Sequence, residues 1–143
     1  MARPDPALLD AARYPYSTII EPRFGDLDVN LHVNNVAMAS MLEEGRVRFH
    51  RQSGFFDSLG GTTSMVANLN IDFLAETHFP QPLQVYCGIL SLGRTSHVLG
   101  QLVTQEGKPV ALSRTVLVTV DADGPVALQP AFLDQTAEWL LRP

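Results

Sequence analysis

The second half of the chain consists of segments in which apolar and polar side chains alternate. A two-residue period is typical of a β-strand with one buried face, and turn signals around Gly93 and Gly107 separate the segments. Because strands joined by tight turns run in opposite directions, we expect an antiparallel sheet. The predicted strands span residues 64–74, 83–89, 97–105 and 110–120. The first should bury the face formed by Met65, Ala67, Leu69, Ile71 and Phe73.

A long helix is predicted before these strands, between residues 36 and 50. Asn34 or Asn35 is suited to cap its first turn. Gly45 in mid-helix costs about 1 kcal/mol relative to Ala, which indicates that a sheet or a symmetry-related helix packs closely there. The apolar face at helical spacing comprises Met38, Leu42, Gly45 and Phe49.

The order of these elements indicates an α+β fold, in which one long helix buries its apolar face against an antiparallel sheet. A short strand within residues 14–23 precedes the helix. At 143 residues the chain is expected to be a single domain over residues 14–143, preceded by an N-terminal arm over residues 1–13. A short second helix is predicted to begin at Gln129-Pro130, with Leu133, Ala137, Leu140 and Leu141 on one face.

The composition excludes several classes of function. Ten Lys and Arg against fifteen Asp and Glu give a net charge of −5, which argues against a nucleic-acid partner. The one cysteine, Cys87, excludes a disulfide framework within the chain and favours a reducing compartment. We find neither an apolar run long enough to span a membrane nor a signal-peptide pattern, so the expected location is cytoplasmic, with no membrane partner.

Polar side chains are concentrated just before the long helix. A carboxylate in such a loop can act as general base on water or attack a carbonyl directly, while Asn and His can orient water or bind an oxyanion. Free N–H groups at the helix start can polarise an acyl carbonyl. The alternative for Asp26, Asn34 and Asn35 is that they only satisfy loop backbone and cap the helix. The residues in this group are Asp26, Asp28, Asn30, His32, Asn34 and Asn35.

Other chemistries lack necessary residues. The Asp26 segment begins like a calcium loop, but Leu31 stands where glycine is needed and Ala37 where a bidentate Glu belongs. The histidines are too scattered for a zinc site, and the motifs of serine hydrolases and nucleotide-binding folds are absent. Cys87 lies within an alternating strand and is interpreted as a core thiol. We therefore predict no metal and no cofactor.

The segment D-L-D-V-N-L-H-V-N-N, residues 26–35, resembles the active-site segment of acyl-ACP thioesterases. R-F-G-D-x-D, followed by a helix with E-x-x-R at Glu43 to Arg46, resembles 4-hydroxybenzoyl-CoA thioesterase-like members of the hotdog superfamily. In a hotdog fold, a curved antiparallel sheet wraps one long central helix, which agrees with the element order predicted above.

The resemblance implies roles for individual residues. Asp28 matches the catalytic carboxylate, and Asn30 and His32 match the residues that accompany it. Glu76 falls where acyl-ACP enzymes carry a further glutamate on the next strand, and the alternative is a surface charge at the end of a strand. Another subgroup places its carboxylate on the helix, where Glu43 and Glu44 lie, although Glu44 is also suited to pair with Arg48. For the phosphates of CoA or a carrier protein we expect Arg94 and Ser96, with Lys108 and Arg114 behind them. The alternative for Arg94 is a solvated turn residue.

The resulting expectation is an acyl-thioester hydrolase acting on acyl-CoA or acyl-ACP. Asp28 would be general base or nucleophile, and N–H groups near Asn34, Asn35 and Val36 would hold the thioester oxygen. Because the chain has room for one hotdog repeat and hotdog sites lie between protomers, a homodimer or homotetramer is expected. The alternatives are a hotdog protein that binds acyl-CoA without hydrolysis, and a hydratase or dehydratase acting on 3-hydroxyacyl thioesters.

Overall fold

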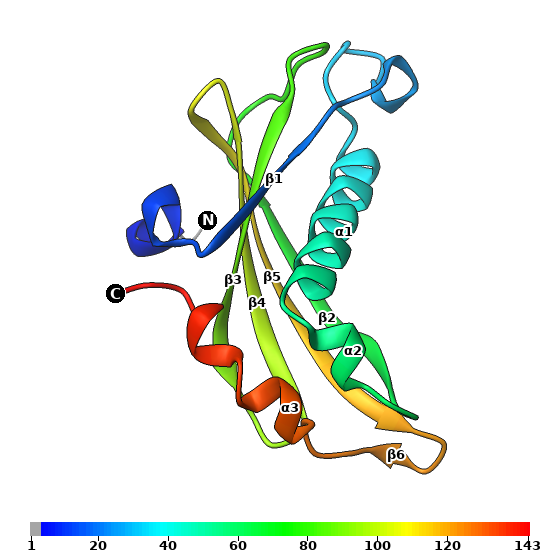
Figure 1. Cartoon of the computed structure of the whole chain (residues 1–143). Helices are drawn as coiled ribbons and strands as arrows, with labels where there is room; N and C mark the ends of the chain where they lie inside the picture. Colours follow the sequence, from blue (N-terminus) through cyan, green and yellow to red (C-terminus); the bar gives the residue numbers. More distant parts are fainter. Residues whose placement is uncertain (1–3) are drawn as a thin grey trace.

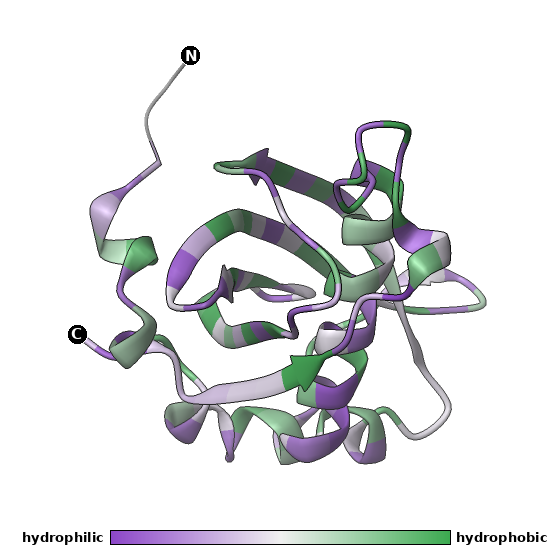
Figure 2. Cartoon of the chain, turned by 90° about the horizontal axis from the view of Figure 1, so that it is seen from above, coloured by the Kyte–Doolittle hydropathy of each residue, from purple (hydrophilic) through white to green (hydrophobic). Residues whose placement is uncertain are grey.

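A long helix lies against one face of a curled antiparallel sheet in the computed structural model, which describes residues 4–143 (Figure 1). The strands are ordered β1-β3-β4-β5-β2, and a short β6 pairs with β5. Hydrophobic and hydrophilic residues alternate along the curled strands (Figure 2). The strands are β1 (Tyr16–Ile20), β2 (Thr63–Phe73), β3 (Leu83–Leu92), β4 (Ser96–Gln105), β5 (Lys108–Asp121) and β6 (Gly124–Pro125). This is the hotdog fold, as predicted.

Helix α1 (Asn35–Gln52) confirms the predicted long helix. Asn34 is its N-cap, since its side-chain oxygen accepts the N–H of Val36 at 2.8 Å. At Gly45 an added Cβ would lie only 2.7 Å from Cγ1 of Val85 on β3. The glycine therefore allows the helix to approach the sheet closely, as its place in mid-helix indicated. A short helix, α2 (Phe55–Ser58), follows.

Strand β2 departs from the predicted alternation. Its pairing with β5 shifts register between Val66 and Asn68, so Ala67 is the extra residue of a bulge. Val66 pairs with the buried Leu117, whereas Met65 lies on the opposite face. The predicted buried face is therefore wrong for Met65 and Ala67. β2 is also an edge strand, so even Leu69 and Phe73 remain 42% and 53% exposed.

The predicted C-terminal helix is also wrong in extent. Only α3 (Pro130–Leu133) and a 3-10 turn, η4 (Thr136–Glu138), form. Beyond them the backbone pairs with β3, where Ile89 N–H donates to the Trp139 carbonyl and Leu141 N–H donates to the Ile89 carbonyl. Strand β1 leaves this stretch of β3 unpaired, because its register stops at Cys87. The C-terminal segment therefore extends along β3 and hydrogen-bonds to its free backbone groups instead of continuing as a helix. The predicted helix face of Leu133, Ala137, Leu140 and Leu141 does not form.

The segment before β1 packs on the outer face of the sheet as two 3-10 helices, η1 (Pro6–Leu9) and η2 (Ala11–Arg13). The Tyr14 hydroxyl donates to the Leu8 carbonyl at 2.7 Å, and Tyr14 packs with Leu102 and Leu112. The segment before β1 and the C-terminal segment lie on the same side of the molecule (Figure 1), where Arg142 N–H donates to the Arg13 carbonyl. The tip of the predicted arm, residues 1–3, lies outside the described residues.

Among the helices of residues 4–143, none is long and apolar enough to cross a bilayer.

Candidate active site

The loop between β1 and α1 folds around the carboxylate of Asp28. Its Oδ1 accepts the backbone N–H groups of Asn30 at 2.8 Å and His32 at 3.2 Å. Backbone bonds close the same turn, with Asp28 N–H donating to the His32 carbonyl at 2.8 Å and Leu31 N–H donating to the Asp28 carbonyl at 3.0 Å. Leu31 adopts a left-handed conformation, with φ of 62°. One oxygen of Asp28 thus holds the loop, while Oδ2 accepts no hydrogen bond from residues 4–143.

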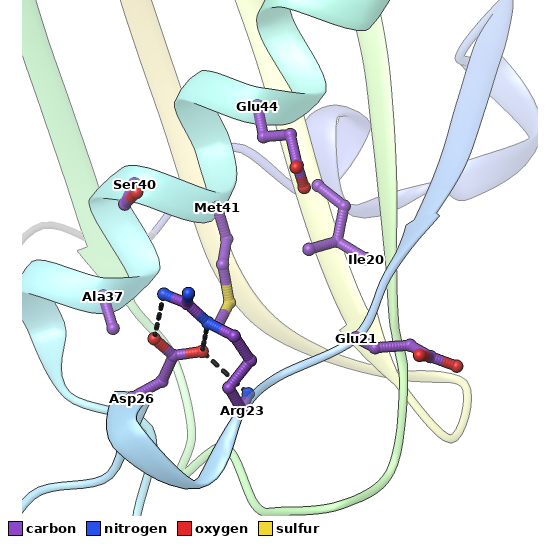
Figure 3. Close-up of a pocket in the computed structure, with 8 residues that line it drawn as sticks. All are labelled: Ile20, Glu21, Arg23, Asp26, Ala37, Ser40, Met41 and Glu44. Atoms are coloured by element: carbon purple, nitrogen blue, oxygen red, sulfur yellow. Dashed lines mark hydrogen bonds and ion pairs between the residues drawn. The ribbon is translucent and has the colours of Figure 1, made fainter.

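Asp26 anchors the loop to the rest of the chain. Its Oδ2 accepts the Arg23 backbone N–H at 2.7 Å, and its Oδ1 lies 3.1 Å from Nη2 of the same arginine (Figure 3). Burial raises the pKa of this carboxyl, but the hydrogen bonds and charge of Arg23 outweigh burial and hold the pKa below its usual value. The Asp26 carbonyl accepts the N–H of Asn34. Asp26 therefore has a clear structural use, which was the alternative considered for it.

His32 meets Glu76 across the loop. Its Nε2 lies 3.3 Å from Oε2 of Glu76, which follows β2 in the chain, and its ring stands edge to face with His78 at a centroid distance of 5.2 Å. The N–H of Val33 donates to the Thr77 carbonyl at 2.8 Å, which ties the two segments together. The structure thus brings together His32 and Glu76, which the family resemblance had only indicated separately. A carboxylate at Nε2 favours the tautomer with its proton on that nitrogen.

The start of α1 lies next to this loop. The Val36 N–H is already donated to the cap oxygen of Asn34. Asn35 is the first residue of the helix, and its side chain, like that of Asn30, makes no hydrogen bond with residues 4–143. Asn34 therefore fixes the first turn of the helix, and the Val36 N–H is less available to bind a substrate carbonyl than the sequence suggested.

The two helix carboxylates have other partners. Glu44 Oε2 lies 3.5 Å from Nη2 of Arg48, as the sequence spacing predicted, and Glu43 Oε2 lies 3.8 Å from Nη2 of Arg46. Glu44 also lines a cleft of about 250 Å³ on the β1 side of α1 (Figure 3). Asp28 and His32 do not line this cleft, so it is separate from the loop chemistry. Its lining comprises Ile20, Glu21, Arg23, Asp26, Ala37, Ser40, Met41 and Glu44.

The residues expected to bind phosphate do not gather at the loop within one chain. Arg94 and Ser96 lie at the β3–β4 turn, at the end of the sheet opposite the start of α1 (Figure 1). Arg114 pairs with Asn70 and Gly100 in the middle of β5. Lys108 pairs with Gln105, at the end of β4 that reaches the loop. Of the four, Lys108 is the residue at the same end of the sheet as His32.

The thiol of Cys87 lies in the core beneath α1, as predicted. Burial raises its pKa to about 12, although a hydrogen bond from Gln101 and the charge of Arg46 oppose the change. A thiol with this pKa is protonated at neutral pH and is a poor nucleophile. Within residues 4–143, no group of three or more His, Cys, Asp or Glu side chains is arranged to hold a metal ion.

The sequence did not indicate which residues hold the segment 76–78 against the loop before α1. Gln105 at the end of β4 bonds to the backbone of His78 and Gln81, and the Thr77 carbonyl accepts the N–H of Val33 in the loop before α1. These contacts join positions 24 to 44 residues apart, so no local pattern could have indicated them. His78 itself follows Glu76 by two positions and was seen only as a scattered histidine.

A curled antiparallel sheet around one helix, with an Asp, Asn and His loop at the helix start, defines a hotdog protein of the thioesterase type. The family model described as the thioesterase-like superfamily matches residues 22–140, and the chain belongs to this superfamily.

Individual relatives agree with this assignment. A thioesterase from Thermus thermophilus, solved in complex with coenzyme A and Zn, is 29% identical with a TM-score of 0.80, covering 92% of this chain and 98% of that one. The probable thioesterase YbaW from Escherichia coli is 26% identical with a TM-score of 0.77, covering 87% and 98%. YsmA from Bacillus subtilis (strain 168), whose function is uncharacterised, is 26% identical over 85% of this chain and 82% of its own. Family and neighbours together support a thioesterase function.

Proposed function

We propose that this protein hydrolyses acyl-CoA thioesters at the loop between β1 and α1. The observation that carries the proposal is that three groups lie at one helix start. They are Oδ2 of Asp28, which accepts no hydrogen bond from residues 4–143, the imidazole of His32 beside Glu76, and the N-terminal turn of α1. CoA is favoured as the carrier by the coenzyme A complex of the Thermus thermophilus relative. An acyl-carrier protein is the alternative carrier that the same assay tests.

Asp28 supplies the reactive oxygen. Because Oδ1 is engaged by two backbone N–H groups, the carboxylate is fixed in orientation and Oδ2 is the atom available to the substrate. It takes a proton from water as the water attacks the acyl carbon, or attacks that carbon itself to give an anhydride that water then cleaves. Both routes break the carbon–sulfur bond and release the acid and the thiol. Oxygen-isotope labelling under single turnover separates them, because only the anhydride route transfers an Asp28 oxygen to the product.

His32 and the helix start assist this attack. With its Nε2 proton donated to Glu76, His32 is held in one orientation, from which the lone pair of Nδ1 orients the attacking water. The departing sulfur takes its proton from the protonated Asp28 or from solvent. Asn30 adds an exposed amide to the same loop. The positive end of the α1 dipole stabilises the negative charge that develops on the thioester oxygen. Since Val36 N–H serves the cap, we assign the oxygen contact to the neighbouring N–H groups of Asn35 and Ala37.

A second copy of the chain completes this site in the proposal. β2 pairs with β5 on one side only and exposes apolar side chains, and an uncovered apolar edge strand favours pairing with another strand. Glu76 lies three residues after the end of β2, so we propose that a partner on β2 also covers the Glu76–His32 pair. We therefore propose a homodimer through β2, with a homotetramer formed if such dimers associate further.

Thiol release from a panel of acyl-CoAs and an acyl-carrier protein tests the function. The wild type should release thiol, and Asp28→Asn and His32→Ala should each lower kcat by about 100-fold or more, the usual contribution of general acid–base groups. Wild-type rates in both variants would refute the assignment. Tight binding of acyl-CoA without thiol release would favour a non-hydrolytic binding protein, and turnover of enoyl-CoA would favour a hydratase.

A further inference from the structure

The connection between β2 and β3, residues 74–82, forms the second wall of the candidate active site. It carries two groups that contact the ring of His32, which are the carboxylate of Glu76 at 3.3 Å and the ring of His78 at a centroid distance of 5.2 Å. The chain here has no helix or strand of its own to hold its shape. The position of these two groups must therefore be set by contacts from elsewhere in the fold.

Gln105 provides the main contacts. Its side-chain oxygen accepts the His78 backbone N–H at 2.8 Å, and its amide nitrogen donates to the carbonyls of His78 at 2.8 Å and Gln81 at 2.9 Å. The residue lies at the end of β4 and is only 6% exposed, so these bonds are shielded from competing water. Among side chains of this length, only a carboxamide can accept and donate in this pattern, since a carboxylate lacks the donors.

A second contact holds the same segment from the other side. Thr77, which is buried, accepts the N–H of Val33 through its carbonyl at 2.8 Å. Residues 76–78 are thus bonded on one side to the loop that carries His32 and on the other side to Gln105. If the Gln105 bonds are lost, the carbonyl of Thr77 still reaches Val33, but nothing from β4 holds His78, and Glu76 gains freedom to leave Nε2 of His32.

We propose that Gln105 is a positioning residue for the reaction, which holds Glu76 and His78 against His32 without touching the substrate. This proposal rests on the function proposed above, because it assigns Gln105 to the same catalytic imidazole. It predicts that Gln105 acts through Glu76, so that the two residues are energetically coupled. It also predicts that loss of Gln105 changes the orientation of His32, whether or not a substrate is present.

Gln101 provides a matched control. It lies four residues before Gln105 on the same face of β4, and it is fully buried. Its amide donates to the Leu42 carbonyl at 2.9 Å in the middle of α1 rather than to the active-site segment. Replacing Gln101 therefore removes a buried glutamine of the same strand and leaves the second wall intact. A merely structural role for Gln105 would make both replacements behave alike.

The kinetic test compares Gln105→Leu and the isosteric Gln105→Glu with Gln101→Leu. Misplacing a catalytic group by about 1 Å can cost about 100-fold in rate, so we expect kcat to fall by about 10-fold or more in both Gln105 variants with little change in KM. Gln101→Leu should lower thermal stability but keep kcat within about 2-fold, since it is distant from the site. In a Glu76→Gln background, Gln105→Leu should add less than about 2-fold, because the group it positions is already lost.

A spectroscopic test does not depend on activity. Two-dimensional ¹H–¹⁵N spectra of the histidine side chains report the tautomer of each neutral imidazole. The wild type should show His32 with its proton on Nε2, and both Gln105 variants should show a mixture of tautomers, while Gln101→Leu should keep the wild-type pattern. If Gln105→Leu does not fold, Gln105→Glu, which keeps the size and the acceptor, decides the question.

The two failures can be told apart. If the wild type releases no thiol from any thioester, the proposed function is wrong, and the His32 spectra still decide whether Gln105 positions this ring. If the wild type is active and folded Gln105 variants keep both kcat and the His32 tautomer, the positioning role is wrong while the thioesterase function stands. If Gln105→Leu and Gln101→Leu lower kcat equally, Gln105 is only a packing residue.

Discussion

Acidification should destabilise the protein through a buried pair of histidines. Nε2 of His50, near the end of α1, lies 3.0 Å from Nε2 of His97 on β4. Both side chains are buried against the ring of Phe55, and His97 also packs against Phe132. One neutral imidazole must donate to the lone pair of the other, so the contact is lost when both are protonated. Burial lowers the pKa of His97 to about 4. Burial, the charge of His97 and the charge of Arg46 lower the pKa of His50 well below its usual value.

The direction and size of the effect follow from the pKa difference between the folded and unfolded chain. Above pH 6.5 both states hold these imidazoles neutral, and the stabilisation is fully present. As the pH falls from 6.5 towards 4, these imidazoles are protonated in the unfolded chain but stay neutral in the folded chain, and the free energy of unfolding decreases. Lowering the pKa of His97 from 6.5 to about 4 corresponds to about 3 kcal/mol, at about 1.36 kcal/mol per pH unit, and the lowered pKa of His50 adds to this loss.

Urea denaturation followed by fluorescence of the only tryptophan, Trp139, measures this loss, because that ring packs 5.8 Å from Phe49 in the core. The comparison is with the double variant His50→Leu, His97→Leu at the same protein concentration, since removing both partners of a buried bond can be nearly neutral. The wild type should lose at least about 3 kcal/mol more than the variant between pH 6.5 and 4, because the variant lacks both histidines. Equal losses in both proteins would refute the reasoning.

Further predictions concern the helix and the edge strand. In Gly45→Ala the new Cβ would lie 2.7 Å from Cγ1 of Val85, and overpacking of this kind costs about 1–3 kcal/mol. The higher helix propensity of Ala offsets about 1 kcal/mol of this cost, so the free energy of unfolding in urea should fall by up to about 2 kcal/mol. A variant stabilised by about 1 kcal/mol, the propensity gain alone, would contradict the close packing. Asn34→Ala should cost about 1 kcal/mol by loss of the cap, whereas Asn35→Ala, which removes no cap bond, should cost less in the same assay. Leu69→Lys on the exposed edge of β2 should convert the proposed dimer to a folded monomer in analytical ultracentrifugation. A Leu69→Lys protein that remains a dimer would place the interface elsewhere.

Much of the fold follows from local patterns. The helical spacing from Met38 to Phe49 and the cap at Asn34 depend only on residues within a few positions of one another, so α1 could be predicted closely. The two-residue period predicted β3, β4 and β5 for the same reason. The polar loop could also be placed at the helix start, since its position depends on chain order alone.

Two elements could not be predicted because their shape depends on distant backbone. The bulge at Ala67 exists only in the pairing of β2 with β5, and it reverses the face of Met65. The C-terminal segment carries a helical pattern, but the unpaired backbone of Ile89 captures it beyond α3. In both cases hydrogen bonds to another strand outweigh local preference, which is a weak determinant by comparison.

Local sequence was enough to specify the long helix, the antiparallel sheet and the identity of the groups gathered before the helix. How these groups are used depends on the folded chain, which bonds one oxygen of Asp28 to its own loop and brings Glu76 to His32. Folding also places Gln105 against residues 27 and 24 positions away along the chain. The chemistry of each side chain follows from the residue itself, whereas the contacts that orient these side chains form between segments that are distant in sequence.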